Sequence, residues 1–286
     1  MAHVRDIEPG AQRVVLIVVA HADDPTLFVG GTIARWADAG WRVVVVRATD
    51  DRWDSVGLSE TETIERSALE LQQAAHVLRI HRIVDLGMAT DSLGDASEVA
   101  LREQIIREIR RWKPYALVTF DPYAMYGEDN QDHVLVAAAT DEAFWTSQFD
   151  KHHPEQTAQG LAPHGCFERW YFGRRVIDVT DVVDTTDTLE RKVDAALCHD
   201  AALRNLVHQL RLQAHTGGWQ IPALDTALDG DLRPVVEPLI RGAAQRTGAR
   251  YGLNAAEEFR IVRFGGLADF LTEHGQPLDR FPDSPT

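Results

Sequence analysis

Stretches of apolar residues alternate with amphipathic stretches through the first half of the chain. Residues 14–20 contain no polar side chain, and residues 43–46 are four consecutive valines, a pattern typical of strands buried on both faces. Residues 59–78 repeat apolar side chains at a spacing close to 3.6, which predicts a helix. We therefore expect strands at residues 13–20, 41–47, 82–86 and 115–120, and helices at residues 30–39, 59–78, 99–112 and 133–144. This alternating order predicts an α/β fold with a doubly wound, mostly parallel sheet.

The second half of the chain is less regular. Polar residues, histidines and prolines fill residues 150–165, which indicates a long loop. After this loop we expect a strand at 170–179, a helix pair or one broken helix at 185–208, and a final strand at 259–264. The C-terminal half would thus add strands and helices to the sheet. The tail at 276–286 is rich in Pro and Asp and is expected to be loosely held.

Composition narrows the classes of partner. The chain has 286 residues, and its 44 acidic residues against 29 basic ones give a formal net charge of -15. Nucleic acids and anionic membranes favour basic surfaces, so we expect neither as a partner and look instead for a small-molecule substrate. Cys166 and Cys198 show no disulfide or metal spacing, and residues 1–12 do not read as a signal peptide, which indicates a cytoplasmic protein. The sequence leaves open whether the chain forms a homo-oligomer.

Three polar residues directly follow the first predicted strand: His21, Asp23 and Asp24. The carboxyl ends of parallel strands form the edge at which open α/β sheets bind their ligands. A histidine and a carboxylate on one turn can hold a divalent metal, and a second carboxylate can act as a base toward water that the metal activates. The alternative is a polar turn in which an aspartate caps the next helix.

A second polar cluster, with Asn130, Asp132 and His133, follows the fourth predicted strand. Because a parallel sheet gathers its strand ends at one edge, His133 can meet His21 although 112 residues (133 minus 21) separate them. Three protein ligands with one open position are typical of a catalytic zinc site. The alternative is a helix start at which Asn130 or Asp132 is the cap and His133 lies exposed in the first turn.

Other candidates carry weaker signals. Asp91 follows the third predicted strand, where it faces the same edge or serves as a turn residue. Tyr126 precedes the second cluster, where its phenol could donate to an oxyanion or pack within its loop. Gly30 and Gly31 come too late after the strand for a dinucleotide fingerprint and indicate close packing of helix and sheet. We expect four further histidines at the surface or behind the site: His152, His153, His164 and His199.

Two motifs carry a resemblance to a known family. His21-Ala22-Asp23-Asp24, followed by Gly30-Gly31-Thr32-Ile33-Ala34, resembles the first motif of the PIG-L/LmbE-like zinc-dependent N-deacetylases. Asn130-Gln131-Asp132-His133 stands where the family has its second motif. Residues 247–252 and 258–260 are similar to the C-terminal segment of the chitobiose- and glucosaminyl-type members, so the resemblance covers residues 13–264.

The resemblance implies a fold and a set of roles. The fold would be one Rossmann-like domain over residues 1–286, with a core at 13–145 and a substrate-side and capping segment at 146–286. One zinc ion would be bound, although other divalent metals fit the same ligands. The implied roles are metal ligation by His21, Asp24 and His133, general base for Asp23, oxyanion stabilisation by Tyr126, and substrate binding by Asp91. Asp132 would support the ligands from behind.

The chain departs from the family pattern at four places. Ala22 and Pro25 are two separate changes in the first motif. The pair Asn130-Gln131 in the second motif is the third, and the two extra residues before it, Glu128 and Asp129, are the fourth. Asn130 can donate a hydrogen bond in catalysis, but it cannot supply a proton. Another proton donor could be Tyr126, Glu128, Asp129 or His274.

The function implied is a zinc-dependent hydrolase that removes an N-acyl group, acetyl in the simplest case, from a small polar, sugar-containing substrate. The alternatives are a zinc-dependent hydratase or lyase acting on a small acid, an amidase of a thiol conjugate, and a non-catalytic binding module.

Overall fold

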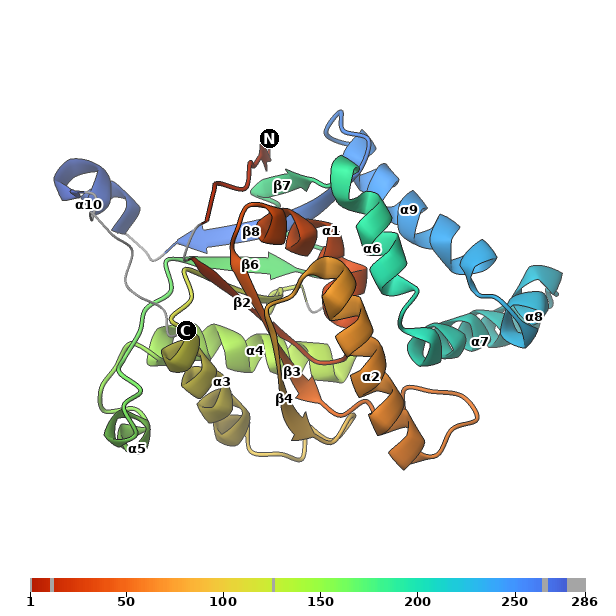
Figure 1. Ribbon diagram of the computed structural model, residues 1–286, viewed down its shortest axis with the longest axis horizontal. Helices are drawn as coiled ribbons and strands as arrows, with labels where there is room; N and C mark the ends of the chain where they lie inside the picture. The colour runs from red at the N-terminus through yellow and green to blue at the C-terminus, as the bar shows by residue number, and fades with distance from the viewer. Residues whose placement is uncertain (1, 11–12, 125–126, 264–266, 277–286) are drawn as a thin grey trace.

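An eight-stranded sheet forms the centre of the molecule, shown in Figure 1 as a computed structural model that describes residues 2–10, 13–124, 127–263 and 267–276. The strands lie in the order β1-β7-β8-β6-β5-β2-β3-β4. In chain order their bounds are His3–Val4 (β1), Val14–Val19 (β2), Arg42–Thr49 (β3), Arg82–Met88 (β4), Ala116–Phe120 (β5), Glu168–Phe172 (β6), Asp181–Asp184 (β7) and Ala256–Arg263 (β8). The strands from β4 to β6 are parallel, whereas β8 runs antiparallel to both β6 and β7. The prediction of a mostly parallel, doubly wound sheet with added C-terminal strands is confirmed.

The direction of chain winding reverses beside β2. From β2 the chain moves outward through β3 to β4, and it then returns to place β5 on the other side of β2. Such a switch point leaves a crevice at the carboxyl ends of the two strands. The two predicted polar clusters follow β2 and β5, so the topology brings both to this crevice.

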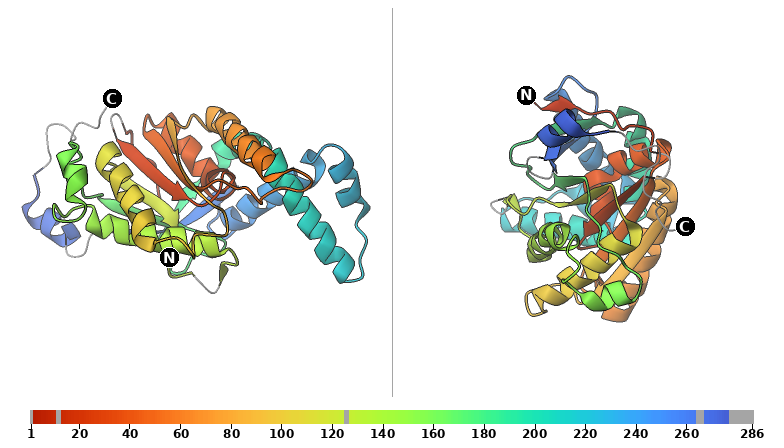
Figure 2. Two further views of the ribbon diagram at one scale, coloured as in Figure 1. Left: turned by 90° about the horizontal axis from the view of Figure 1, so that it is seen from below. Right: turned by 90° about the vertical axis from the view of Figure 1, so that its left-hand side faces the viewer.

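Helices cover both faces of the sheet (Figures 1 and 2). Alternate residues of β2 point to opposite sides, since Val15 and Ile17 pack with α1, whereas Leu16 and Val18 pack with α3 and α4. All of these side chains are fully buried. The helices span Asp24–Asp38 (α1), Glu60–Leu78 (α2), Glu98–Trp112 (α3), Gln131–Thr146 (α4), Pro154–Ala158 (α5), Leu189–Ala196 (α6), Asp200–Thr216 (α7), Pro222–Asp229 (α8), Arg233–Ala249 (α9) and Leu267–His274 (α10).

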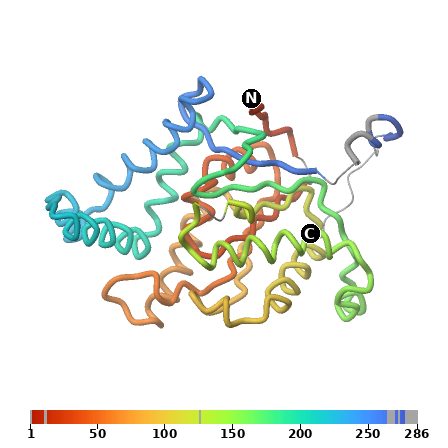
Figure 3. Tube along the Cα trace, turned by 180° about the vertical axis from the view of Figure 1, so that it is seen from behind, coloured from red at the N-terminus to blue at the C-terminus, as the bar shows by residue number. Residues whose placement is uncertain are grey.

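The C-terminal half extends away from the sheet at both ends of the molecule. Helices α7 and α8 form an arm at one end, and α10 lies at the other (Figures 1 and 3). The arm and α9 share a small core, which includes Leu203, Leu224 and Val236. No helix within the described residues is long and apolar enough to cross a membrane.

Helix α1 begins six residues earlier than we expected, at Asp24 instead of Gly30, because two helical segments join at a break. Val29 has φ -127° and ψ 18°, which interrupts the helical hydrogen bonds. Two distant side chains satisfy the freed groups. The Lys192 ammonium donates to the Phe28 carbonyl at 3.2 Å, while the Glu257 carboxylate accepts from the amides of Gly31 and Thr32 at 2.9 and 2.8 Å.

The break also explains the glycine pair. A Cβ added at Gly31 would lie 2.7 Å from the Thr185 side chain and 3.0 Å from Glu257 Oε1. Close packing, as expected, is what requires glycine here. Because the first turn of α1 belongs to the helix, Asp24 is held by regular backbone structure rather than by a loop.

Several other boundaries in the C-terminal half were wrong. The strand expected at 170–179 ends at Phe172, and the strand expected at 259–264 begins at Ala256. The expected 185–208 helices are a 3-10 turn at Thr186–Thr188 followed by α6 and α7. Helix α5 lies within the segment expected to be a loop, and α8, α9, β1 and β7 had no counterpart in the sequence prediction. The tail from residue 277 lies outside the described residues.

Candidate active site

His21, Asp24 and His133 meet at the switch point between β2 and β5. His21 Nδ1 lies 3.1 Å from His133 Nε2, and the Asp24 carboxylate oxygens lie 3.1 Å from His133 Nε2 and 3.5 Å from His21 Nδ1. All three residues are buried. Ligand atoms about 2.0–2.1 Å from a tetrahedral ion would be separated by about 3.3 Å. The two imidazole nitrogens have this spacing, and one ligand atom from each of the three residues lies within 4.8 Å of the others. The residues present therefore fit a divalent metal.

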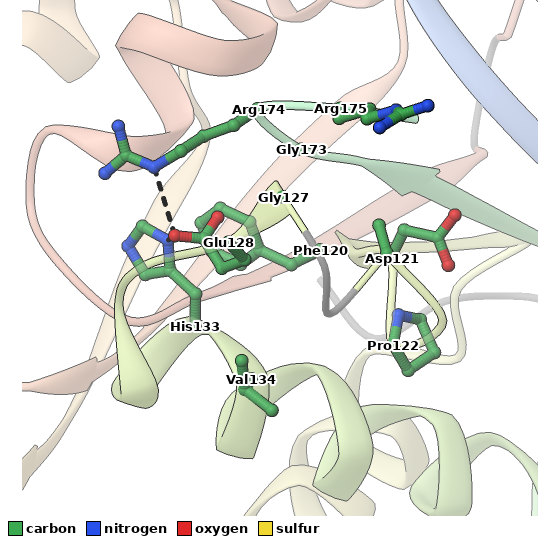
Figure 4. A pocket seen from close by; sticks show the side chains of 11 residues that line it. Phe120, Asp121, Pro122, Gly127, Glu128, His133, Val134, Gly173, Arg174 and Arg175 are labelled. Atoms are coloured by element: carbon green, nitrogen blue, oxygen red, sulfur yellow. Dashed lines mark hydrogen bonds and ion pairs between the residues drawn. The ribbon is translucent and has the colours of Figure 1, made fainter. Parts of the chain in front are cut away.

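The outer nitrogens of both histidines face carboxylates. His21 Nε2 lies 3.5 Å from Asp132 Oδ2, and His133 Nδ1 lies 3.2 Å from Glu128 Oε1. Glu128 in turn accepts from Arg174 Nε at 3.0 Å, as Figure 4 shows. A carboxylate behind a ligating histidine fixes its ring orientation and raises its basicity. Asp132 thus lies behind His21, and its supporting role stays a prediction; the corresponding position of Glu128 behind His133 was not anticipated.

The electrostatics of the cluster favour a bound cation. Burial lowers the pKa of His133, but the charges of Asp24 and Glu128 outweigh it and raise that pKa to about 9. Burial opposes ionisation of Asp24, yet His133 and His21 hold its pKa well below the ordinary range. In the absence of metal the cluster thus attracts protons to its histidines, and a divalent ion supplies the same positive charge at the shared position.

Asp23 is placed to act as a base. It occupies the N-cap position of α1, but its side chain makes no capping hydrogen bond, so the alternative of a structural cap does not hold for it. The half-buried carboxylate lines the open pocket beside the three ligand residues. Burial and the negative charge of Asp24 raise the pKa of Asp23 to about 7. A base near the working pH accepts and returns protons efficiently.

Asn130 serves as a cap and also faces the pocket. Its side-chain oxygen accepts from the Asp132 amide at 2.9 Å at the start of α4, as the capping alternative requires. Asn130 also lines the pocket, so its amide nitrogen remains available as a hydrogen-bond donor. Tyr126 lies outside the described residues.

Asp91 lies at the surface rather than in the pocket lining. Its side chain is exposed, and its backbone has φ 55°. Its backbone amide donates to Asp132 at 2.7 Å, which holds the carboxylate that faces His21. Binding of substrate by the Asp91 side chain stays a prediction.

The pocket over the cluster has a volume of about 350 Å³ and is walled by three segments beyond the motifs. The loop after β3 contributes Asp51 and Asp54, and α2 contributes Glu70. Burial raises the pKa of Asp54 to about 7, and the charge of Asp51 adds to the effect. Asp51 also accepts from the Ala22 amide at 3.0 Å and pairs with Arg47, so it braces the turn that carries His21.

Helix α7 supplies the remaining wall, which sequence reasoning missed. His199, expected at the surface or behind the site, is buried and lines the pocket, and burial lowers its pKa to about 4. Its Nε2 lies 3.0 Å from the Thr26 hydroxyl. A neutral imidazole therefore stands beside a largely acidic pocket. The C-terminal candidate for proton donation, His274, lies on α10 at the opposite end of the molecule from α7 and does not reach the pocket (Figure 1).

The sequence is similar to proteins named as deacetylases. Residues 16–144 match the family described as "PIG-L: GlcNAc-PI de-N-acetylase". The 1D-myo-inositol 2-acetamido-2-deoxy-alpha-D-glucopyranoside deacetylase of Rhodococcus jostii (strain RHA1) is 30% identical over 322 aligned positions, which cover 95% of this chain and 98% of the relative. The enzyme of the same name from Rhodococcus opacus (strain B4) is 33% identical over 167 positions, but that match covers only 49% of this chain and 56% of the relative.

The fold is similar to a solved deacetylase structure. The N,N'-diacetylchitobiose deacetylase from Pyrococcus horikoshii superimposes with a TM-score of 0.72, covering 88% of this chain and 84% of the other, at 24% sequence identity. This likeness spans both the parallel core and most of the C-terminal half.

Proposed function

The chain belongs to the PIG-L family of GlcNAc-PI de-N-acetylases, and from this premise we propose that it is a zinc-dependent hydrolase that removes an N-acetyl group from a small, sugar-containing molecule. The observation that carries the proposal is the geometry at the switch point. One ligand atom from each of His21, Asp24 and His133 lies within 4.8 Å of the others. The carboxylate of Asp23, which makes no hydrogen bond to the described residues, lines the pocket beside them. The cytoplasmic location and any homo-oligomer stay predictions.

His21, Asp24 and His133 would hold the metal. When bound, a zinc ion acts as a Lewis acid that acidifies water and polarises a carbonyl oxygen. Asp132 and Glu128 hold the two imidazole rings in orientation from behind. Phe120 stacks on His133 with ring centroids 4.0 Å apart and restricts its tilt.

Asp23 performs the proton transfers. Its carboxylate takes a proton from the attacking water and returns that proton to the departing amine. This dual role removes the need for a separate acid at Asn130, where the resemblance expects a histidine. The Asn130 amide group donates to the carbonyl oxygen as negative charge develops there.

The pocket favours a polar substrate. Its wall presents hydrogen-bonding groups from α2 and α7, including Ser67, Asn205 and Gln209. A sugar ring offers hydroxyl groups to such donors and acceptors, and a pocket of about 350 Å³ accommodates a small molecule of that size.

The test combines metal content with amine release. Protein purified without chelator should contain one zinc per chain by elemental analysis and should release free amine and acetate from N-acetylglucosamine derivatives. His133→Ala should abolish both. His215→Ala removes an exposed histidine of α7 and should change neither.

Two outcomes would overturn the proposal. Metal content that does not fall in His133→Ala would exclude the ligand set. Full metal content without amine release from any acylated amino sugar would favour the hydratase or lyase alternative instead.

A further inference from the structure

A second hollow adjoins the active-site pocket and differs from it in charge. It is an open groove of about 670 Å³ between the loop that follows β6 and helix α9. Apolar side chains form its floor, among them Phe172, Val179, Ala244 and Ala256. Basic side chains surround that floor: Arg174, Arg175, Lys192, Arg246 and Arg250.

Two of these arginines have no partner, which is unusual in this chain. Among the described residues, four arginines have a guanidinium with neither a hydrogen bond nor an ion pair: Arg35, Arg82, Arg175 and Arg246. Arg175 and Arg246 both line the groove and are exposed. Neither is neutralised in a protein whose formal net charge is -15.

The carboxylates of the groove are already paired. Glu257 accepts from Lys192 at 2.7 Å, and Glu258 pairs with Arg250 at 2.6 Å. Arg174 pairs with Glu128 and points toward His133, whereas Arg175 extends in the opposite direction (Figure 4). The groove therefore carries net positive charge from Arg175 and Arg246.

The groove shares part of its lining with the catalytic pocket. Leu27, Phe28 and Arg174 line both hollows. Leu27 and Phe28 belong to the first turn of α1, which also carries Asp24, and one turn of helix rises about 5.4 Å. A substrate with its acyl group at Asp24 can therefore reach the groove with its far end.

We propose that the groove is a subsite for an anionic group, a phosphate or a carboxylate, on the part of the substrate remote from the acylated nitrogen. The proposal rests on the proposed function. Guanidinium groups bind both anions through paired N–H donors. A chain with a large negative charge repels anions over most of its surface, so two unneutralised arginines beside the active site supply the local attraction. The apolar floor accommodates the carbon skeleton next to the charged group.

Kinetics on matched substrates test the subsite. The substrates are N-acetylglucosamine, its 1-phosphate, its 6-phosphate and N-acetylmuramic acid, which separate two phosphate positions from a carboxylate. We expect at least one anionic substrate to have a higher kcat/KM than the neutral sugar. Arg175→Gln/Arg246→Gln should lower the ratio of anionic to neutral kcat/KM by about tenfold or more, because charge-assisted hydrogen bonds are lost.

The matched control removes two unpartnered arginines elsewhere. Arg35→Gln/Arg82→Gln changes the net charge equally and should leave the ratio within about twofold, since long-range charge effects are screened by salt. Equal falls in the two double variants, or no preference for any anionic substrate in the wild-type protein, would overturn the subsite.

Calorimetry separates this proposal from the proposed function because it needs no turnover. Glucose 1-phosphate, glucose 6-phosphate and glucuronic acid serve as probes, with glucose as the neutral reference. Binding of an anionic probe that weakens in the groove variant would support the subsite even in a protein without deacetylase activity. Deacetylation of N-acetylglucosamine without any such difference would overturn the subsite and leave the proposed function standing.

Discussion

The catalytic pocket and the arginine groove share one wall but are built in contrasting ways. In the pocket the ionisable groups are buried and lie within 3.5 Å of one another, from Asp132 through His21 to Asp24 and His133. In the groove Arg175 and Arg246 are exposed and have no partner within the described part of the chain. The first turn of α1 separates the two and contributes Leu27 and Phe28 to both.

The contrast reflects the different demands of chemistry and recognition. A metal ligand must be held within a fraction of an ångström, which close packing and neighbouring carboxylates favour. A group that recognises substrate must be free to bind an incoming anion. A guanidinium that is already paired would first have to break its existing ion pair. The first turn of α1 can line both the pocket and the groove because Lys192 and Glu257 hold the break that follows it.

The largest expected effect is on the catalytic side of this contrast. Asp23→Asn should keep the metal and lower kcat by about 10² to 10⁴, because the amide cannot accept the proton. Elemental analysis and initial rates measure the two quantities. Asp95→Asn, an exposed aspartate outside the pocket lining, is the control. Loss of metal together with activity would show that Asp23 is a ligand and would exchange its role with that of Asp24.

Replacement of Lys192, which braces the break in α1 between the two regions, should lower the free energy of unfolding. Lys192→Met leaves the Glu257 carboxylate buried without its cation, and removal of one partner of a buried ion pair costs about 3–5 kcal/mol. Denaturant unfolding measures the change in the free energy of unfolding. Lys151→Met removes a lysine from an exposed pair with Asp150 and should change it little. Equal effects of the two variants would contradict the bracing role of Lys192.

Substitution of Glu128 tests whether the carboxylate behind His133 contributes to metal affinity. Glu128→Gln should weaken metal binding by about 10- to 100-fold, because the carboxylate that orients the imidazole is lost. Competition with a chelator measures the affinity. Glu273→Gln is the matched control, since Glu273 lies 3.5 Å from His274 Nε2 outside the pocket. An unchanged affinity in Glu128→Gln would remove Glu128 from the site.

The smallest effect concerns pH. In the metal-free protein the pKa of His133 is raised from 6.5 to about 9, so its contribution to stability is present below about pH 6.5 and is lost as pH rises toward 9. A bound metal takes the place of the proton and removes this loss. The Tm difference between metal-loaded and chelator-treated protein should therefore widen from about pH 6.5 to about pH 9. A constant or shrinking difference would contradict the cation-attracting character of the cluster.

The parallel half of the fold could be read from the sequence, because its strands are uninterrupted apolar runs and its helices follow them in regular order. The same regularity placed His21, Asp24 and His133 at one edge. The C-terminal half could not be read in this way. Strand β8 enters the sheet antiparallel between β6 and β7, and the pairing depends on residues more than 70 positions apart, such as Asp181 with Phe259.

The missed parts of the site have a common physical cause. The start of α1 was placed at Gly30 because the break at Val29 is stabilised by Lys192 and Glu257, which no local pattern connects to it. Likewise, His199 enters the pocket only because α7 packs across α2, where Glu70 accepts from the Ala201 amide at the N-terminus of α7. Chemistry that follows a strand is visible in a sequence, whereas walls supplied by distant helices are not.

Anomalous diffraction at the zinc edge tests the central claim most directly. Crystals of the metal-loaded protein should show one anomalous peak per chain, about 2.0–2.2 Å from His21 Nδ1, His133 Nε2 and an Asp24 carboxylate oxygen. A peak of full occupancy elsewhere, for example at the surface cluster of Glu103, His153 and Glu155, with none at the switch point, would contradict the account.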